Sequence, residues 1–238
     1  ITARSSDNAN NIQDVFVVGT SSASVAIDFA APNSLVNSIS SGSFYNTIAQ
    51  IAGTAVDVGS LSDVTLVEIQ IRNFASDNVE NGNDTYWGGS SFLGSSSWVA
   101  VNFTPAPSLN WTYASVPNWA GEGSRRYRVS VRATDKAMNL QSFQEGPIFA
   151  FEVVAPTATI TQPGNLSGWG YFPTISGTAT DNLGATDAGI VLSTNVQVAI
   201  TRQDDLRCWN NAAWVVAPCH PLWKDATSFV GGSSGTWS

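Results

Sequence analysis

The stretch VSVRATDKAMNLQ, at residues 129–141, has a close match earlier in the chain, ITARSSDNANNIQ at residues 1–13. The two stretches align without a gap, so that Asp7 matches Asp135, 128 positions later. Self-similarity at a fixed spacing is the sequence signature of repeated structural units. The chain is therefore predicted to contain more than one copy of a single unit.

Further matches keep the same order along the chain. IAQIAGTAVD (48–57) aligns with FPTISGTATD (172–181), and YWGGSSF (86–92) aligns with CWNNAAW (208–214). The aromatic residues continue the pattern: Trp87 matches Trp209, Phe92 matches Trp214, Trp98 matches Trp223 and Trp111 matches Trp237. A repeat of roughly 125–130 residues has the length of one ordinary domain. We expect the closing strands of a preceding repeat at 1–22, a complete repeat at 23–154, and a repeat lacking its last two strands at 155–238.

Short apolar runs separated by Gly, Asn, Asp and Pro predict β-strands throughout. In VEIQIR (67–72), Val67, Ile69 and Ile71 alternate with polar residues, which is the period of a half-buried strand. About seven such strands per unit predict a β-sandwich, so the fold class is all-β, with tandem immunoglobulin-like β-sandwich repeats. The expected strands of the complete unit are VAIDF (25–29), IAQIAGTA (48–55), VTLVEIQIR (64–72), WVAVNF (98–103), YRVSVRA (127–133) and FAFEVV (149–154).

Two segments carry a family resemblance. ISGTATDN (175–182) and YRVSVRATDKAMN (127–139) resemble bacterial immunoglobulin-like repeats, which occur in series in large secreted adhesins, surface proteins and filament or sheath components. The resemblance implies an extracellular or cell-surface location and a structural or adhesive role, and it names no ligand. The chain departs from the family pattern at Met138, where these repeats usually have Gly in a turn.

Composition narrows the functional classes. The net charge of −8 argues against nucleic-acid binding, which needs a basic face. We interpret the one basic cluster as a solvated strand face; its members are Arg125, Arg126, Arg128 and Arg132. No apolar run approaches the roughly 20 residues of a membrane helix, so no membrane span is expected. The start at Ile1, without an initiator Met or signal peptide, indicates a processed product or an internal segment.

Repeated turns supply candidate calcium ligands. Calcium prefers oxygen ligands, which Asp and Asn side chains on turns provide. The alternative is an Asx-turn, in which the Asp side chain accepts hydrogen bonds from backbone N–H groups. Ca²⁺ is thus the one candidate cofactor, and its expected place is near a junction between repeats. Its candidate ligands are Asp7, Asn11, Asp57, Asp135, Asn139 and Asp181.

The segment QDDLRCWNNAAWVVAPCHPLWK (203–224) combines tryptophans with both cysteines of the chain. Cys208 and Cys219 are expected to form a local disulfide in an oxidising compartment; two free thiols are the alternative. Clustered exposed tryptophans would suit glycans or a partner surface. Because the matching segment has aromatic residues at the same spacing, we favour the interpretation that these tryptophans pack within their own domain. The candidate aromatic surface comprises Trp209, Trp214 and Trp223.

Catalysis finds little support. The single histidine, His220, lies between Cys219 and Pro221 in a predicted loop, and Asp204–Asp205 lie on a predicted turn. No phosphate-binding glycine loop or His/Cys metal cluster is present. We therefore predict that the chain is not an enzyme. Four Asn-x-Ser/Thr sequons are candidate glycosylation sites, at Asn83, Asn102, Asn110 and Asn165.

The two end pieces are complementary parts of one unit. Either the chain is cut from a longer array, or the strands Ile1–Val18 of one copy complete residues 155–238 of another copy, giving a head-to-tail filament. The expected function is thus a structural component of an extracellular repeat array or surface filament. The expected partners are other copies or adjacent repeats. The alternative is an adhesin or carbohydrate-binding module with glycan partners.

Overall fold

The computed structural model describes residues 1–57, 63–105, 109–165, 167–168, 171, 173–181, 195–216 and 222–238. Within these residues the elements are β-strands and one short 3₁₀ helix, η1 (Trp119–Glu122), which lies between β9 (Asn110–Tyr113) and β10 (Arg125–Asp135). The expected all-β class is therefore confirmed. No helix in the described ranges has the length and apolar character needed to cross a membrane.

The central region, residues 23–154, contains a first sheet of four antiparallel strands. In β3, buried and half-buried residues alternate, with Ile51, Gly53 and Ala55 facing the interior. This is the expected consequence of alternating Cβ directions along a strand. The strand order is β1 (Asn33–Val36), β3 (Ile51–Val56), β9 (Asn110–Tyr113), β8 (Asn102–Thr104).

A second sheet of the central region is built around two long antiparallel strands, β4 (Val64–Asn73) and β10 (Arg125–Asp135). Val129 pairs with Ile71 and Val131 with Ile69. The short strand β2 joins the sheet parallel to β11, while the other pairings are antiparallel. The remaining strands are β2 (Phe44–Tyr45), β11 (Ile148–Phe151), β5 (Thr85–Trp87), β6 (Phe92–Leu93) and β7 (Val99–Ala100).

Both sheets contribute to one hydrophobic core. Ile51 and Trp111 from the first sheet belong to the same cluster as Ile69 and Tyr127 from the second. Trp119, from η1, packs edge-on against Tyr127 with ring centroids 4.9 Å apart. Aromatic side chains bury large areas in this geometry, so they account for much of the hydrophobic stabilisation.

The predicted apolar face of β4 is confirmed, because Val67, Ile69 and Ile71 are all buried. The opposite face is less exposed than expected for a half-buried strand. Gln70 is also buried, and its Nε2 donates a hydrogen bond to Ser96 Oγ over 2.8 Å. Ser96 lies outside the strand, so the alternation within one strand cannot predict this contact.

The basic cluster is not a solvated face, so that prediction was wrong. Arg128 is buried and forms ion pairs with Glu80 (2.8 Å) and Glu145 (2.7 Å). Arg132 pairs with Glu68 (2.8 Å), and its guanidinium lies 4.3 Å from the ring centroid of Trp98. Glu68 lies on β4 and Glu80 follows it, so the pairing of β10 with β4 brings these two to the arginines, whereas Glu145 lies on the chain between β10 and β11.

In the described part of the C-terminal region, residues 155–238, the strands form three smaller sheets. Its small core consists of Ala179, Val196, Ala226 and Trp237. The four-stranded sheet has the order β12 (Thr157–Gln162), β13 (Ser176–Thr180), β19 (Ser234–Trp237), β18 (Phe229–Gly231). Two further pairs are β14 (Gln197–Val198) with β17 (Lys224–Asp225), and β15 (Cys208–Trp209) with β16 (Trp214–Val215).

One glycine–tryptophan contact occurs in both four-stranded sheets. A Cβ added to Gly53 would lie 1.9 Å from the Leu35 carbonyl oxygen and 2.5 Å from Trp111 Cζ2. At Gly177 the corresponding distances are 1.8 Å to the Thr159 oxygen and 2.6 Å to Trp237 Cζ2. Each tryptophan Nε1 also donates to the carbonyl oxygen one residue after its glycine, over 3.2 and 3.1 Å.

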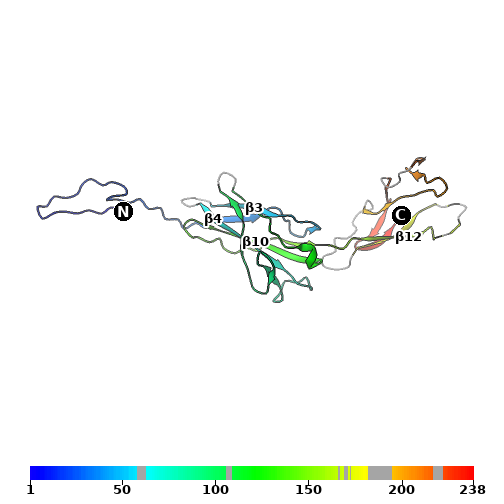
Figure 1. Cartoon of the computed structure of the whole chain (residues 1–238), viewed down its shortest axis with the longest axis horizontal. Helices are drawn as coiled ribbons and strands as arrows, with labels where there is room; N and C mark the ends of the chain where they lie inside the picture. Colours follow the sequence, from blue (N-terminus) through cyan, green and yellow to red (C-terminus); the bar gives the residue numbers. More distant parts are fainter. Residues whose placement is uncertain are drawn as a thin grey trace.

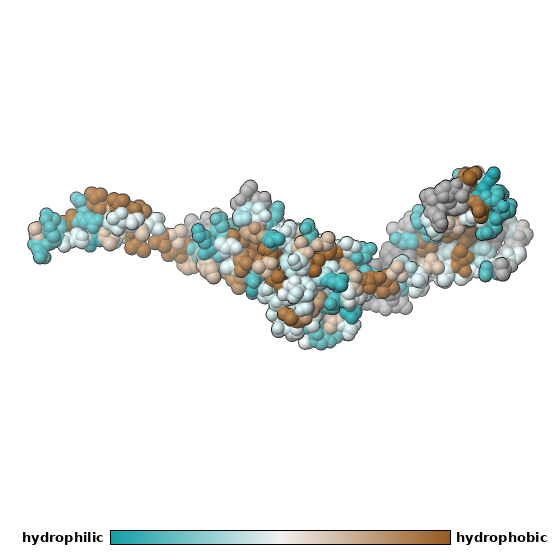
Figure 2. All heavy atoms as spheres, viewed as in Figure 1, coloured by the Kyte–Doolittle hydropathy of each residue, from teal (hydrophilic) through white to brown (hydrophobic). Residues whose placement is uncertain are grey.

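The N-terminal segment, residues 1–29, projects away from the sheets (Figure 1). It forms an extended hairpin held by isolated bridges, Thr2↔Ser22 and Ser6↔Ile12 among them. The strand predicted at 25–29 is absent, because no neighbouring described strand pairs with these residues. Hydrophobic residues lie on the surface of this segment (Figure 2). The exposed ones are Ile1, Ile12, Val15, Phe16, Val17, Val18, Val25, Ile27 and Phe29.

Candidate functional site

Three carboxylates meet at one end of the central region. Asp135 is the last residue of β10, Asp57 follows β3, and Asp28 lies on the chain that leads into β1. One oxygen from each lies within 4.8 Å of the others, and Asp135 is fully buried. Among the described residues this is the one group of three or more acidic, His or Cys side chains with such geometry.

The turn after β10 holds Asp135 in place. The Asn139 backbone N–H donates to Asp135 Oδ1, and Asn139 Nδ2 donates to Oδ2, both over 2.8 Å. Asn139 Nδ2 also donates a hydrogen bond to the Asp28 carbonyl oxygen over 3.1 Å. The amide therefore links the turn to the incoming chain, and Met138 completes the turn with a left-handed φ of 70°.

The donor set fits a hard cation. Carboxylate oxygens bind Ca²⁺ at roughly 2.3–2.6 Å, so oxygens up to about 5 Å apart can share one ion. Two predicted ligands, Asp57 and Asp135, are brought together, whereas Asn139 uses its amide nitrogen to orient Asp135 and Asp28. Sequence reasoning missed Asp28. Its signal is the match of IDFAAP (27–32) with FEVVAP (151–156), where Asp28 aligns with Glu152.

The matching N-terminal turn has the same hydrogen bonds. The Asn11 N–H donates to Asp7 Oδ1 (2.9 Å) and Asn11 Nδ2 donates to Oδ2 (2.7 Å). Asn10 has a φ of 64°, close to that of Met138. The Asn11 side-chain hydrogen bond, with help from backbone N–H groups, lowers the pKa of Asp7 below its usual value. In this segment the Asx-turn predicted as the alternative is present.

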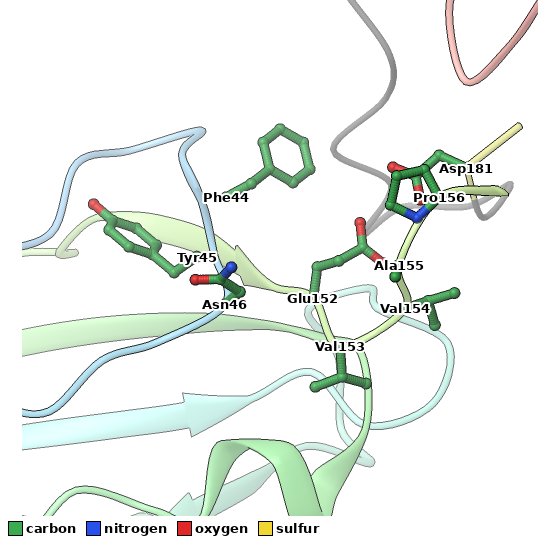
Figure 3. Close-up of a pocket in the computed structure, with 9 residues that line it drawn as sticks. All are labelled: Phe44, Tyr45, Asn46, Glu152, Val153, Val154, Ala155, Pro156 and Asp181. Carbon is green, nitrogen blue, oxygen red and sulfur yellow. The ribbon is translucent and has the colours of Figure 1, made fainter. Parts of the chain in front are cut away.

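The last predicted calcium ligand, Asp181, lines a pocket of about 560 Å³ with Glu152. Both residues are buried, and Figure 3 shows them with Pro156 and Phe44 around the same opening. By sequence, Glu152 matches Asp28 and Asp181 matches Asp57, each 124 positions later. The pocket thus contains counterparts of two of the three clustered carboxylates.

The three tryptophans of the predicted aromatic surface lie on β15, on β16 and just before β17. Trp209 and Trp214 pair across β15 and β16 with ring centroids 5.6 Å apart, much as Trp87 and Phe92 do at 5.3 Å. Trp223 is half exposed.

Cys208 is buried and disulfide-bonded. Its expected partner Cys219 lies outside the described residues, as do His220 and Pro221. Asp204 and Asp205 form ion pairs with Arg202 at the surface, the first over 3.1 Å.

All four sequon asparagines are exposed. At Asn83 the side-chain nitrogen donates to Asp77 Oδ2 over 3.0 Å, so glycosylation there would remove a hydrogen bond of this loop.

Comparison with known proteins gives no further identification. No family model, curated protein or solved structure matches the chain.

Proposed function

We propose that the chain is a structural component of an extracellular array of tandem immunoglobulin-like β-sandwich repeats, similar to bacterial immunoglobulin-like repeats. The carrying observation is the glycine–tryptophan contact, formed by Gly53 with Trp111 and by Gly177 with Trp237 in sheets of the same strand pattern. One polypeptide would not build such a specific close approach twice, at nearly constant spacing, unless both regions were copies of one unit.

Strand registers support the same assignment. Ile69 pairs with Val99 in the central region, and Val198 pairs with Lys224 in the C-terminal region. The adjoining hydrogen bonds also match: Val101 N–H donates to the Val67 carbonyl over 3.0 Å, and Ala226 N–H donates to that of Val196 over 2.9 Å. In this proposal, β1 to β11 form the complete repeat within residues 23–154, and residues 155–238 hold strands of the next.

Location provides the direct test of this function. Antibodies raised against the chain are expected to label intact, unpermeabilised cells of the source organism, seen by immunogold electron microscopy along extended surface structures. Labelling that appears only after permeabilisation would contradict an extracellular array.

Calcium at the junctions of the array is part of the proposal. The oxygens of Asp28, Asp57 and Asp135 cluster where one repeat is entered from the preceding one. A bound divalent cation would offset the repulsion among these carboxylates and stiffen the junction.

Glycan binding is the second candidate function. The observation that favours it is the half-exposed Trp223, since an exposed indole face can stack on a sugar ring. The expected result under this alternative is binding on a glycan array that Trp223→Ala abolishes. Unchanged binding by that variant would exclude Trp223 as the binding residue, and no binding by either protein would contradict this alternative.

A further inference from the structure

The β14 edge of the C-terminal region corresponds to a covered edge in the central region. VQVAI (196–200) aligns with VEIQI (67–71), so β14 matches β4. In the central region β4 is paired on one side with β7 and on the other with β10. Among the described residues, β14 pairs only with β17. Within these residues no strand pairs with the side of β14 that corresponds to the β10 side of β4, and backbone groups along such a side are where a strand can be added.

Side chains beside the β14 edge are more exposed than their counterparts. Ile200 is 36% exposed, whereas its counterpart Ile71 is buried at 1%. Trp223 is half exposed, whereas the face of its counterpart Trp98 is covered by Arg132 at 4.3 Å. A cavity of about 340 Å³ lies next to Ile200, and its lining also includes Ile175, Val198, Trp209 and Trp237.

The N-terminal segment has the backbone pairing of the hairpin that covers β4. In the central region the Val129 N–H donates to the Pro147 carbonyl over 3.1 Å. In the segment, the Ile1 amino group donates to the Ala23 carbonyl over 2.8 Å. In sequence, Ile1 matches Val129 and Ala23 matches Pro147. The N-terminal segment therefore has the same register as β10 and the chain entering β11, although no further strand of the described residues pairs with the segment.

Side chains that would face a core are exposed on this segment. Val25 is 60% exposed and Ile27 is 65% exposed. Their counterparts, 124 positions later, are Phe149 and Phe151, which are buried at 1% and 3%. An isolated two-stranded hairpin is marginally stable in water, so these apolar residues favour docking onto another sheet.

We propose that the N-terminal segment of one copy adds to the β14 edge of a second copy, as β10 and β11 add to β4. This inference rests on the proposed repeat relationship and names the partner, a second copy of the same chain. Transfer of the β10–β4 register places Ile1 opposite Ile200 and Ala3 opposite Val198. Arg4, the counterpart of Arg132, then covers the exposed ring of Trp223.

A second match involves the carboxylates of the 560 Å³ pocket, Glu152 and Asp181. Asp135 lies with Asp28 and Asp57 in the central region. Asp7 matches Asp135, and the docked segment carries it to Glu152 and Asp181, the counterparts of the other two. One placement of the segment thus brings a strand to β14, an arginine to the exposed Trp223 and a third carboxylate to Glu152 and Asp181. Joining copies in this way is heterologous, so association extends head to tail.

Sedimentation velocity on the full chain over a concentration series tests the proposal. The expected result is a set of oligomers that grows with concentration. Val25→Asp is expected to weaken association by about a hundredfold or more, because docking would bury its carboxylate. The matched control is Val18→Asp, at an exposed position in a loop longer than its counterpart, where association stays unchanged. A monomer at every concentration, or equal loss in both variants, would overturn the proposal.

Cysteine cross-linking tests the register and identifies the partner. Ala3→Cys with Val198→Cys is expected to give an intermolecular ladder on non-reducing gels, because the matching residues Val131 and Ile69 are paired across β10 and β4. Ala3→Cys with Val230→Cys, an exposed residue of β18, is the control and should remain monomeric. A disulfide formed within one chain, or ladders of equal strength in both variants, would rule out this register between copies.

Failure of the proposal is distinguishable from failure of the repeat assignment. If the chain stays monomeric while residues 23–154 fold alone as one cooperative unit, strand addition between copies is wrong and the repeats stand. If residues 23–154 do not fold alone, the unit boundaries themselves are wrong, and with them the counterparts on which the register depends.

Discussion

Met138 has a left-handed backbone conformation, at a turn position where the similar bacterial repeats usually have glycine. Its φ is 70° and its side chain is exposed, so no packing of the side chain offsets the strain. An L-residue in this conformation costs roughly 1–2 kcal/mol, and glycine's extra chain entropy cancels part of the gain from replacing it.

Met138→Gly is therefore expected to raise the free energy of unfolding of the central region by about 0.5–1 kcal/mol. Urea denaturation followed by tryptophan fluorescence measures this change. Met138→Ala is the control and should give no increase, because alanine has the same restriction at positive φ. A stabilised alanine variant would show that the methionine side chain, and not its backbone, was unfavourable.

The Asp7 turn is expected to depend on pH. Because its hydrogen bonds with Asn11 lower the pKa of Asp7 in the folded turn, the ionised form is favoured there. The stabilisation is present above the ordinary Asp pKa of about 3.9 and is lost as pH falls through the lower folded value. Amide proton shifts of Ala9 and Asn11, followed by NMR in an acid titration, should report this loss. In Asp7→Asn the same shifts should show no such titration.

At the scale of elements, the close approach of Gly53 determines how β1 and β3 pack with Trp111. An added methyl group would overlap the Leu35 carbonyl oxygen at 1.9 Å, and a backbone atom cannot move away as a flexible side chain can. Gly53→Ala is expected to lower the free energy of unfolding by about 2–3 kcal/mol or more. Gly177→Ala should destabilise the C-terminal region for the same reason.

Thermal denaturation followed by near-ultraviolet circular dichroism measures both losses through the tryptophan signals. Gly82→Ala is the matched control, because no atom lies within 4 Å of the added carbon. If Gly53→Ala unfolds at the same temperature as the control, the strands are less tightly packed than the structure has them.

Calcium binding is predicted at the Asp28, Asp57 and Asp135 cluster. Added Ca²⁺ is expected to raise the melting temperature of the chain, because an ion that binds only the folded state stabilises it. Asp57→Asn should reduce this shift, whereas Asp14→Asn, at an exposed aspartate outside the cluster, should leave it unchanged. Equal melting temperatures with calcium and with a chelator would refute a calcium site.

At the scale of the whole molecule, the central region has a core to which both of its sheets contribute. Residues 23–154 are therefore expected to unfold in a single cooperative transition when expressed alone. Calorimetry should give equal calorimetric and van't Hoff enthalpies. A broad transition would place the boundaries elsewhere.

Much of the architecture could be predicted from the sequence, because the signals concerned are local. The period-two pattern of residues 67–72 indicates a strand by itself, and β4 has the expected buried face. The matched Asp–Asn turns are likewise short-range, since each is made by five consecutive residues. The strand at 25–29 could not be predicted correctly, because a strand requires a neighbour as well as a pattern.

The sequence alone determined the all-β class and the spacing of the matching segments, since alternation and self-similarity are properties of the chain itself. Only the tertiary structure brought Asp28 to Asp57 and Asp135, paired Arg128 with Glu80, and left Trp223 exposed where Trp98 is covered. These features join residues that are distant in sequence. They depend on which strands become neighbours, and strand pairing is decided by burial across the whole fold.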